Sequence, residues 1–216
     1  MVRAPGPRPR TGDRHRPGYP DLVLRARSTS RDLALIAVFA ALIAALGLPG
    51  GLYVFGSSVP ITAQTLGVML AGSILGARRG ALAVATFLVL VAAGLPLLAS
   101  GRGGLGVFLS PSGGFLIGWV TGAWVIGRLV ELWPRGLVFG WGLIANVVGG
   151  IVVVYAFGVP VMAAGAGITL VQSLTASWVY VPGDLAKAVL AAVIAAGVQR
   201  GYPLLPSRDR AREDAR

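Results

Sequence analysis

Six long apolar stretches, separated by short connections, organise this sequence. They lie at residues 32 to 48, 60 to 76, 80 to 98, 113 to 132, 136 to 159 and 181 to 199. Each is about as long as an α-helix that crosses the hydrocarbon core of a bilayer. Since a spanning segment must satisfy its own backbone hydrogen bonds there, we expect an all-α integral membrane protein with six transmembrane helices. A short interfacial helix is expected within 163 to 178.

The positive charges alternate between the two sides that six spans define. Arg78 and Arg79 lie between the second and third stretches, and Arg128, Glu131 and Arg135 lie around the junction of the fourth and fifth, on the same side as two arginine-rich chain ends. The opposite side is nearly uncharged. Because cytoplasmic loops of membrane proteins are enriched in Lys and Arg, both termini are predicted to be cytoplasmic, in a multi-pass protein of the cell membrane.

The predicted organisation has three parts. Residues 1–31 form a basic, proline-rich cytoplasmic tail that we expect to be disordered. Residues 32–199 form a six-helix membrane domain that binds a substrate, and residues 200–216 form a second basic cytoplasmic tail. The net charge of +11 comes largely from these tails, so the expected partner of the charge is the anionic lipid bilayer and not nucleic acid.

Several chemistries are excluded from the apolar body. The chain has no cysteine, and its one histidine, His15, lies in the first tail. Cysteine nucleophiles, thiolate metal sites and a Ser/His/Asp triad are therefore not expected, and neither is any other catalytic or metal site. A P-loop for ATP is also missing. We expect a protein that is not an enzyme and needs no cofactor, and uphill transport would need energy from another subunit or an ion gradient.

Three charged residues fall on the otherwise uncharged outer side. Lys187 is the only lysine, and it follows Asp184 by three residues, which places both on one face of the last helix. Arg102 lies in the connection between the third and fourth stretches. Ionisable residues in a membrane usually mark a functional site, so these three predict a ligand site. The alternative is an intrahelical pair in which Lys187 simply extends toward the membrane surface.

The connection around Arg102 is unusual for an exposed loop. Residues 99 to 115 combine many glycines with apolar Leu105, Val107, Phe108 and Leu109. Irregular backbone is tolerated at membrane depth where it lines a cavity. The sequence therefore predicts a glycine-rich, partly re-entrant outer loop between helices 3 and 4.

Six motifs occur in the order and spacing of a known family: Val59-Pro-Ile-Thr-Ala-Gln-Thr-Leu-Gly, Leu75-Gly-Ala-Arg-Arg-Gly-Ala, Ala93-Gly-Leu-Pro, Gly103-Gly-Leu-Gly, Pro111-Ser-Gly-Gly-Phe and Pro182-Gly-Asp-Leu-Ala-Lys-Ala. Through them the chain resembles the BioY family, the biotin-binding S components of energy-coupling factor (ECF) transporters. The resemblance runs from about residue 33 to 199. It implies high-affinity capture of biotin from outside, with a transmembrane coupling subunit and two cytoplasmic ATPases as partners.

The resemblance also implies a set of biotin-binding residues. Asp184 and Lys187 match the family's Pro-Gly-Asp-x-x-Lys pattern, and Gln64 matches Pro-Ile-Thr-x-Gln-Thr, although its side chain can instead bridge helices. The ureido ring of biotin offers two N–H donors and one C=O acceptor, and its tail ends in a carboxylate, so Asp184 and Gln64 suit the ring while Lys187 and Arg102 suit the tail. Apolar walls are expected from aromatic residues, with these candidates: Phe108, Phe115, Tyr53, Phe55, Trp178 and Tyr180.

Two questions stay open in the sequence. Leu116 stands where some relatives carry an arginine, so the cation that holds the carboxylate is not fixed. Ala37, Ala41 and Ala45 match the alanine row that docks the coupling subunit in S components, but small residues at this spacing also suit packing within the body. The alternatives for function are an S component for another small vitamin and a stand-alone biotin facilitator.

Overall fold

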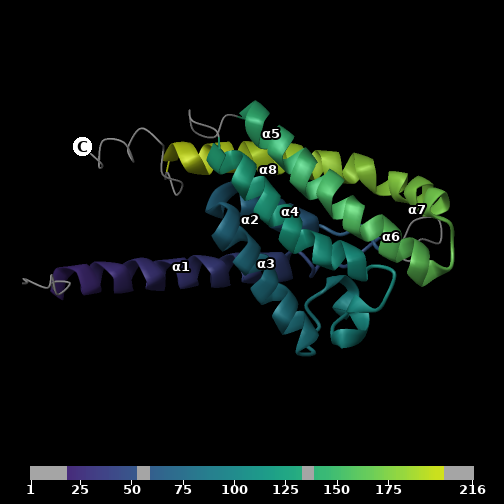
Figure 1. Cartoon of the computed structure of the whole chain (residues 1–216), viewed down its shortest axis with the longest axis horizontal. Coiled ribbons are helices and arrows are strands. Elements are labelled where there is room, and N and C mark those ends of the chain that lie inside the picture. The colour runs from purple at the N-terminus through teal and green to yellow at the C-terminus, as the bar shows by residue number, and fades with distance from the viewer. Residues whose placement is uncertain (1–18, 53–58, 133–138, 202–216) are drawn as a thin grey trace, which may run out of the picture.

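The computed structural model describes residues 19–52, 59–132 and 139–201, and side chains from Ser30 onward. Within these ranges the protein is helical and contains no strand, only two isolated β-bridges. Its long helices are α1 (Tyr19–Ala45), α2 (Gln64–Leu75), α3 (Ala77–Ala92), α4 (Gly113–Leu132) and α8 (Val181–Gly201). The fifth span consists of α5 (Phe139–Val147), a π-helical turn η3 (Val148–Val153) and α6 (Val154–Ala166). The predicted six-helix architecture is confirmed (Figure 1).

Among the residues that the structure describes, three continuous helical stretches are long and apolar enough to cross a membrane, namely Gly113–Leu132, Phe139–Ala166 and Leu170–Gly201. The last joins α7 (Leu170–Ser177), a 3-10 turn η4 (Trp178–Tyr180) and α8. The short α7 falls within the range predicted for an interfacial helix. Its first turn carries a capping box, in which the Thr169 hydroxyl accepts from the Gln172 backbone and the Gln172 side chain accepts from the Thr169 backbone.

Several boundaries differ from the prediction for identifiable reasons. Helix α1 begins at Tyr19, so residues 19 to 31 are helical although we expected disorder up to 31. The last proline of that segment is Pro20, in the first turn, where proline is tolerated. At the other end of the body, α6 continues through Pro160 to Ala166, whereas the predicted fifth span ends at residue 159. The tails 1–18 and 202–216 lie outside the described residues.

The second span begins later than predicted, and the third span ends earlier. Helix α2 begins at Gln64, where the Thr62 hydroxyl accepts the backbone N–H of Gln64, and residues 60 to 63 are not helical. Helix α3 ends at Ala92, before Gly94, which has a φ of 104° that favours glycine. Both departures place irregular backbone at the same end of the molecule.

Helix α4 lies at the centre of the body and packs against α2, α3 and α6 (Figure 1). Glycine allows the helices to approach this closely. A Cβ on Gly127 would overlap the backbone of Gly76 and Ala77, and one on Gly122 would lie 2.6 Å from the carbonyl oxygen of Gly149. Small residues at such crossings are typical of helix packing in membranes, where close van der Waals contact drives association.

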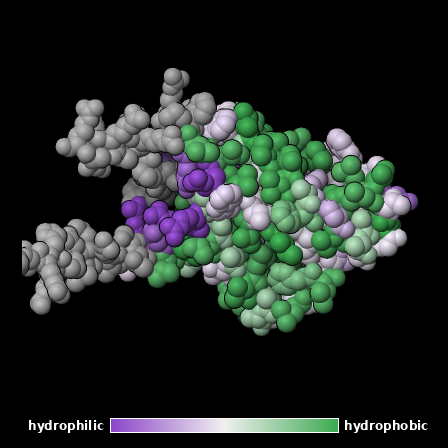
Figure 2. All heavy atoms as spheres, viewed as in Figure 1, coloured by the Kyte–Doolittle hydropathy of each residue, from purple (hydrophilic) through white to green (hydrophobic). Residues whose placement is uncertain are grey.

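One end of the body carries most of the described charged side chains. Arg79 forms a 2.9 Å ion pair with Asp32, which joins α3 to α1, and Glu131 of α4 accepts the backbone N–H of Ala77 at the start of α3. The Gln199 amide of α8 donates to the carbonyl of Ile74 at the end of α2. These contacts bring the end of α2, the start of α3 and the last turns of α4 and α8 together. Figure 2 shows hydrophilic residues gathered at this end, beside a largely hydrophobic surface.

Candidate functional site

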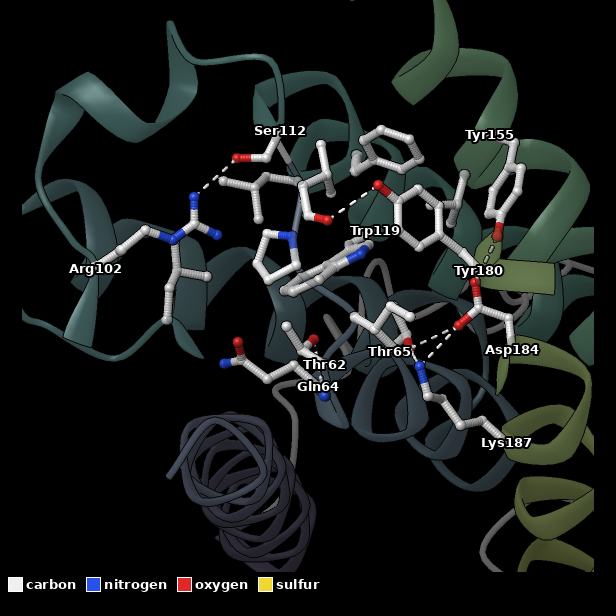
Figure 3. A pocket seen from close by; sticks show the side chains of 17 residues that line it. Thr62, Gln64, Thr65, Arg102, Ser112, Trp119, Tyr155, Tyr180, Asp184 and Lys187 are labelled. Carbon is white, nitrogen blue, oxygen red and sulfur yellow. Dashed lines mark hydrogen bonds and ion pairs between the residues drawn. The ribbon is translucent and has the colours of Figure 1, made fainter. Parts of the chain in front are cut away.

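A pocket opens at the opposite end of the body, where α2, α4 and α8 begin. Its empty space, counting the part open to solvent, is about 570 Å³. Its lining comes from the irregular residues before α2, the loop between α3 and α4, and the first turns of α2, α4, α6 and α8 (Figure 3). The shortened α2 and α3 therefore leave room for this pocket.

One wall of the pocket carries a buried ion pair with two hydroxyl partners. Lys187 donates to Asp184 Oδ1 at 2.8 Å and to the Thr65 hydroxyl at 3.0 Å. The Thr65 hydroxyl lies 3.3 Å from the same Oδ1, and the Tyr155 hydroxyl donates to Asp184 Oδ2 at 2.8 Å. Residues from α2, α6 and α8 thus meet on one carboxylate (Figure 3).

Asp184 and Lys187 lie on one face of α8. Asp184 lies in the first turn of α8. Lys187 follows one turn later on the same face, so the sequence spacing alone brings the two charges together. The ammonium group of Lys187 has three protons and donates two hydrogen bonds within the protein, which leaves one donor for a ligand.

The facing wall carries Arg102, which lies across the pocket from Asp184 and Lys187 in Figure 3. Its guanidinium donates to the Ser112 hydroxyl at 3.2 Å, and its Nε is buried without a hydrogen-bond partner. Among the side chains that the structure describes, no carboxylate pairs with it. A buried donor without a hydrogen-bond partner is costly, so the half-buried Arg102 is suited to an anionic ligand group.

Gln64 lines the pocket, but its side-chain amide forms hydrogen bonds with the protein backbone. Its Nε2 donates to the carbonyl oxygens of Ile43 at 3.2 Å and Leu97 at 3.0 Å, and its Oε1 accepts the backbone N–H of Ala99 at 2.9 Å. The side chain therefore ties α1, α2 and the loop before α4 together. This is the bridging arrangement that the sequence left open, and it leaves one lone pair of Oε1 for a ligand.

The loop between α3 and α4 folds back onto the body, as the glycine-rich sequence predicted. It contains two short 3-10 turns, η1 (Ala99–Gly101) and η2 (Leu105–Phe108), and the Gly104 N–H donates to the carbonyl of Val91 in α3. Val107 is buried, but Leu109 is 88% exposed, so only part of the apolar run enters the protein.

Aromatic side chains form the wall between the two charged ends. The ring of Phe115 makes edge-to-face contacts with Tyr155 at 5.8 Å and with Tyr180 at 6.5 Å between centroids. Trp119 also lines the pocket, and the Tyr180 hydroxyl donates to the carbonyl of Val59. The surface between the charges is thus largely apolar and rigidly packed.

The structure brings together five of the six predicted ligand residues: Asp184, Lys187, Gln64, Arg102 and Phe115. Phe108 instead packs against the hydrophobic core. Of the other aromatic candidates, Tyr180 lines the pocket, Trp178 is 65% exposed, and Tyr53 and Phe55 lie outside the described residues.

Five polar or aromatic residues that line the pocket were not predicted from the sequence: Thr62, Thr65, Ser112, Trp119 and Tyr155. Thr62, Thr65 and Ser112 belong to motifs that were singled out for neighbouring residues, so the motifs themselves could have indicated them. Tyr155 and Trp119 stand within apolar runs without any polar pattern. Only the packing of α4 and α6 identifies them.

The alanine row of α1 lies on the surface. Ala37, Ala41 and Ala45 are exposed, whereas Ala40 on the neighbouring face is 3% exposed and belongs to the core. The row is therefore not used for packing among the described residues of the body.

A solute-sized pocket at one end of a bundle of membrane-spanning helices defines a membrane protein that binds a small polar solute. A family model described as the BioY family matches residues 21–204. The chain belongs to the BioY family.

Proteins similar to this chain agree with the family. The biotin transporter BioY of Rhizobium etli is 51% identical over 185 residues, which cover 83% of this chain and 99% of that protein. Its counterpart in Rhodobacter capsulatus is 43% identical over 182 residues, with 80% and 95% covered. A crystal structure of the S-component for biotin from an ECF-type ABC transporter matches with a TM-score of 0.77 and 32% identity, and the match covers 81% of this chain and 93% of that one.

Proposed function

We propose that this protein captures biotin outside the cell and takes it up as the substrate-binding S component of an ECF-type transporter. The observation that carries the proposal is the two-ended pocket, with a hydrogen-bonded Asp184–Lys187 pair at one end and Arg102, free of any carboxylate partner among the described residues, at the other. The similar proteins named biotin transporter support the same substrate.

The two ends of the pocket suit the two ends of biotin. Asp184 is an acceptor for a ureido N–H, and the remaining proton of Lys187 is a donor for the ureido carbonyl. Arg102 then receives the carboxylate of the tail, because Lys187 is already paired while the Arg102 Nε has no partner. Phe115 supports the thiophane ring and valeryl chain. We assign Gln64 chiefly to holding the loop that carries Arg102.

The charge of the pocket also suits this ligand. Two cations, Arg102 and Lys187, and one anion, Asp184, leave a formal charge of +1. Biotin carries one negative charge when its carboxylate is ionised, so the occupied pocket is neutral. A neutral complex avoids an uncompensated charge in a site of low dielectric constant.

We place the pocket on the outer side of the membrane and both termini in the cytoplasm. The end of the body opposite the pocket carries Asp32, Arg79, Arg128 and Glu131, and arginine-rich loops favour the cytoplasmic side. Transport then requires partners that supply energy, since the sequence has no nucleotide-binding motif. The exposed row Ala37, Ala41 and Ala45 is our candidate contact for a membrane coupling subunit, which in turn would carry two cytoplasmic ATPases.

Calorimetry on the purified protein in lipid nanodiscs tests the proposal. Biotin should bind without any partner subunit, and desthiobiotin, which keeps the ureido ring and the carboxylate, should bind more weakly. Thiamine, a cation, should not bind at the concentrations used. Binding of thiamine but not biotin would assign the protein to another vitamin. Biotin uptake into vesicles without ATPase subunits would instead favour a stand-alone facilitator.

A further inference from the structure

The fifth span is interrupted by a π-helical turn, and it contacts α8 on both sides of that turn. Before it, the Asn146 amide donates to the carbonyl of Ala188 at 3.4 Å and accepts from the Ser73 hydroxyl at 2.8 Å. After it, the Tyr155 hydroxyl donates to Asp184 at 2.8 Å. Asn146 and Tyr155 therefore face the same neighbouring helix, although the π-helical turn Val148–Val153 separates them.

A regular α-helix would not allow this arrangement. Tyr155 follows Asn146 by nine positions, and at about 100° per residue this is two and a half turns, so the two side chains would lie on opposite faces. A π-helical turn accommodates one additional residue. The separation then corresponds to roughly eight α-helical residues, or about 80°. The π-helical turn thus keeps both side chains directed toward α8.

The packing of the turn favours this geometry. Gly149 and Gly150 are both buried within it. A Cβ on Gly149 would lie 2.5 Å from Ile126, and one on Gly150 would lie 2.5 Å from Met69, so α4 and α2 press closely against the wider turn. By contrast, Val152 is 59% exposed.

We infer that Tyr155 is a positioning residue of the ligand site and that the π-helical turn sets its direction. The phenol holds Asp184 Oδ2, while Lys187 and Thr65 hold Oδ1, so the plane of the carboxylate is fixed. One lone pair of Oδ2 then remains, and it can accept a ring N–H of the ligand from a fixed direction. This inference rests on the proposed function.

The contact is tested with Tyr155→Phe, which keeps the ring that packs on Phe115 and removes only the hydroxyl. The ligands are biotin and two cyclic-carbamate analogues, in each of which oxygen replaces one ureido N–H. Tyr155→Phe should weaken biotin binding about tenfold. For the analogue that lacks the N–H facing Asp184, the same substitution should weaken binding less than threefold. Ser73→Ala, which removes a hydrogen bond at the other end of the span, should leave the ratio of these affinities unchanged.

A loss of similar size for biotin and both analogues would show a general structural effect and overturn the inference, and so would an unchanged affinity for biotin. Absence of biotin binding to the unaltered protein would instead refute the proposed function, so the two failures are distinguishable.

The turn itself is tested by a matched deletion and insertion. Removing Val152 leaves a separation of eight positions between Asn146 and Tyr155, which in a regular α-helix is about 80°, so biotin affinity should stay within threefold. Inserting one alanine after Val152 should rotate Tyr155 by about 100° and weaken binding more than tenfold. An insertion that retains binding, or a deletion variant that melts cooperatively but has lost it, overturns the role of the turn. If either variant fails to fold, the Tyr155→Phe comparison still decides the inference.

Discussion

Lys187 and Asp184 form a 2.8 Å ion pair within one turn of α8, and their side chains are only 16% and 8% exposed. Taking two charges out of water is costly, and the pair offsets this cost only while both members are present. The sequence spacing is compatible with a lysine that extends to the membrane surface, but the structure directs it into the pocket. The pair is therefore both a structural element and the polar end of the candidate site.

Lys187→Met should destabilise the protein, by about 3 kcal/mol or more, because it leaves Asp184 buried without its cation. The double variant Asp184→Asn with Lys187→Met removes both charges and should recover most of the lost stability, yet bind biotin at least tenfold more weakly. Thermal unfolding followed by tryptophan fluorescence measures the first effect and calorimetry the second. A double variant that binds biotin normally would exclude the pair from the ligand site.

Arg102→Gln should weaken the binding of biotin about tenfold or more, because a charge-assisted hydrogen bond to the carboxylate is lost. The neutral primary amide of biotin should be affected much less. Calorimetry with both ligands gives the difference. Arg128→Gln is the matched control, since Arg128 pairs with Glu131 in α4 at the end of the body opposite the pocket. Equal losses for the acid and the amide would contradict the assigned role of Arg102.

Ala41→Leu should leave biotin binding intact but lower ATP-dependent uptake in a reconstituted complex, because Ala41 is exposed on the proposed docking row. Ala40→Leu is the contrasting variant. Ala40 is buried in the core, so overpacking there should cost about 1 to 3 kcal/mol of stability. The measurements are biotin affinity, uptake into proteoliposomes and co-purification with the coupling subunit. Normal uptake by Ala41→Leu would direct the search for the docking surface elsewhere.

Gly158→Ala should disturb the apolar wall of the pocket. Gly158 faces the ring of Phe115, and an added Cβ would overlap that ring. We expect a loss of about 1 to 3 kcal/mol in stability together with weaker biotin binding. Gly197→Ala adds the same methyl group in α8 where no atom lies within 4 Å, so it should be neutral or slightly stabilising. Equal melting temperatures for the two variants would show that the Phe115 ring accommodates the added methyl group without a loss of stability.

The parts of the fold that follow from local sequence were predictable. Helix α4 begins and ends at the predicted residues, because Pro111 and Gly113 punctuate its start and polar residues return at its end. The Asp184–Lys187 pair follows from helical spacing alone. In contrast, α6 passes through Pro160. Proline is tolerated in membrane helices because neighbouring helices compensate for the lost hydrogen bond. The sequence of a single segment does not indicate those neighbours.

The less predictable parts of the site depend on contacts between distant segments. Tyr155 stands in an apolar run, and its direction depends on a π-helical turn that a regular helical period misplaces. The role of Gln64 depends on where the loop after α3 returns to the body. Its motif indicated that the residue is functionally important, but not that Leu97 and Ala99 are its hydrogen-bond partners. Phe108 was expected at the ligand because of its place in the loop, but the turn η2 directs it to the core.

The three hydrogen bonds of Gln64 affect the rate and the affinity with which the vitamin can bind. They fasten α1 and the segment Leu97–Ala99 to the first residue of α2, a few residues before Arg102. The guanidinium is thereby held in place before any solute arrives. The entropy of ordering this segment is lost when the chain folds, and little of it remains to be lost at capture.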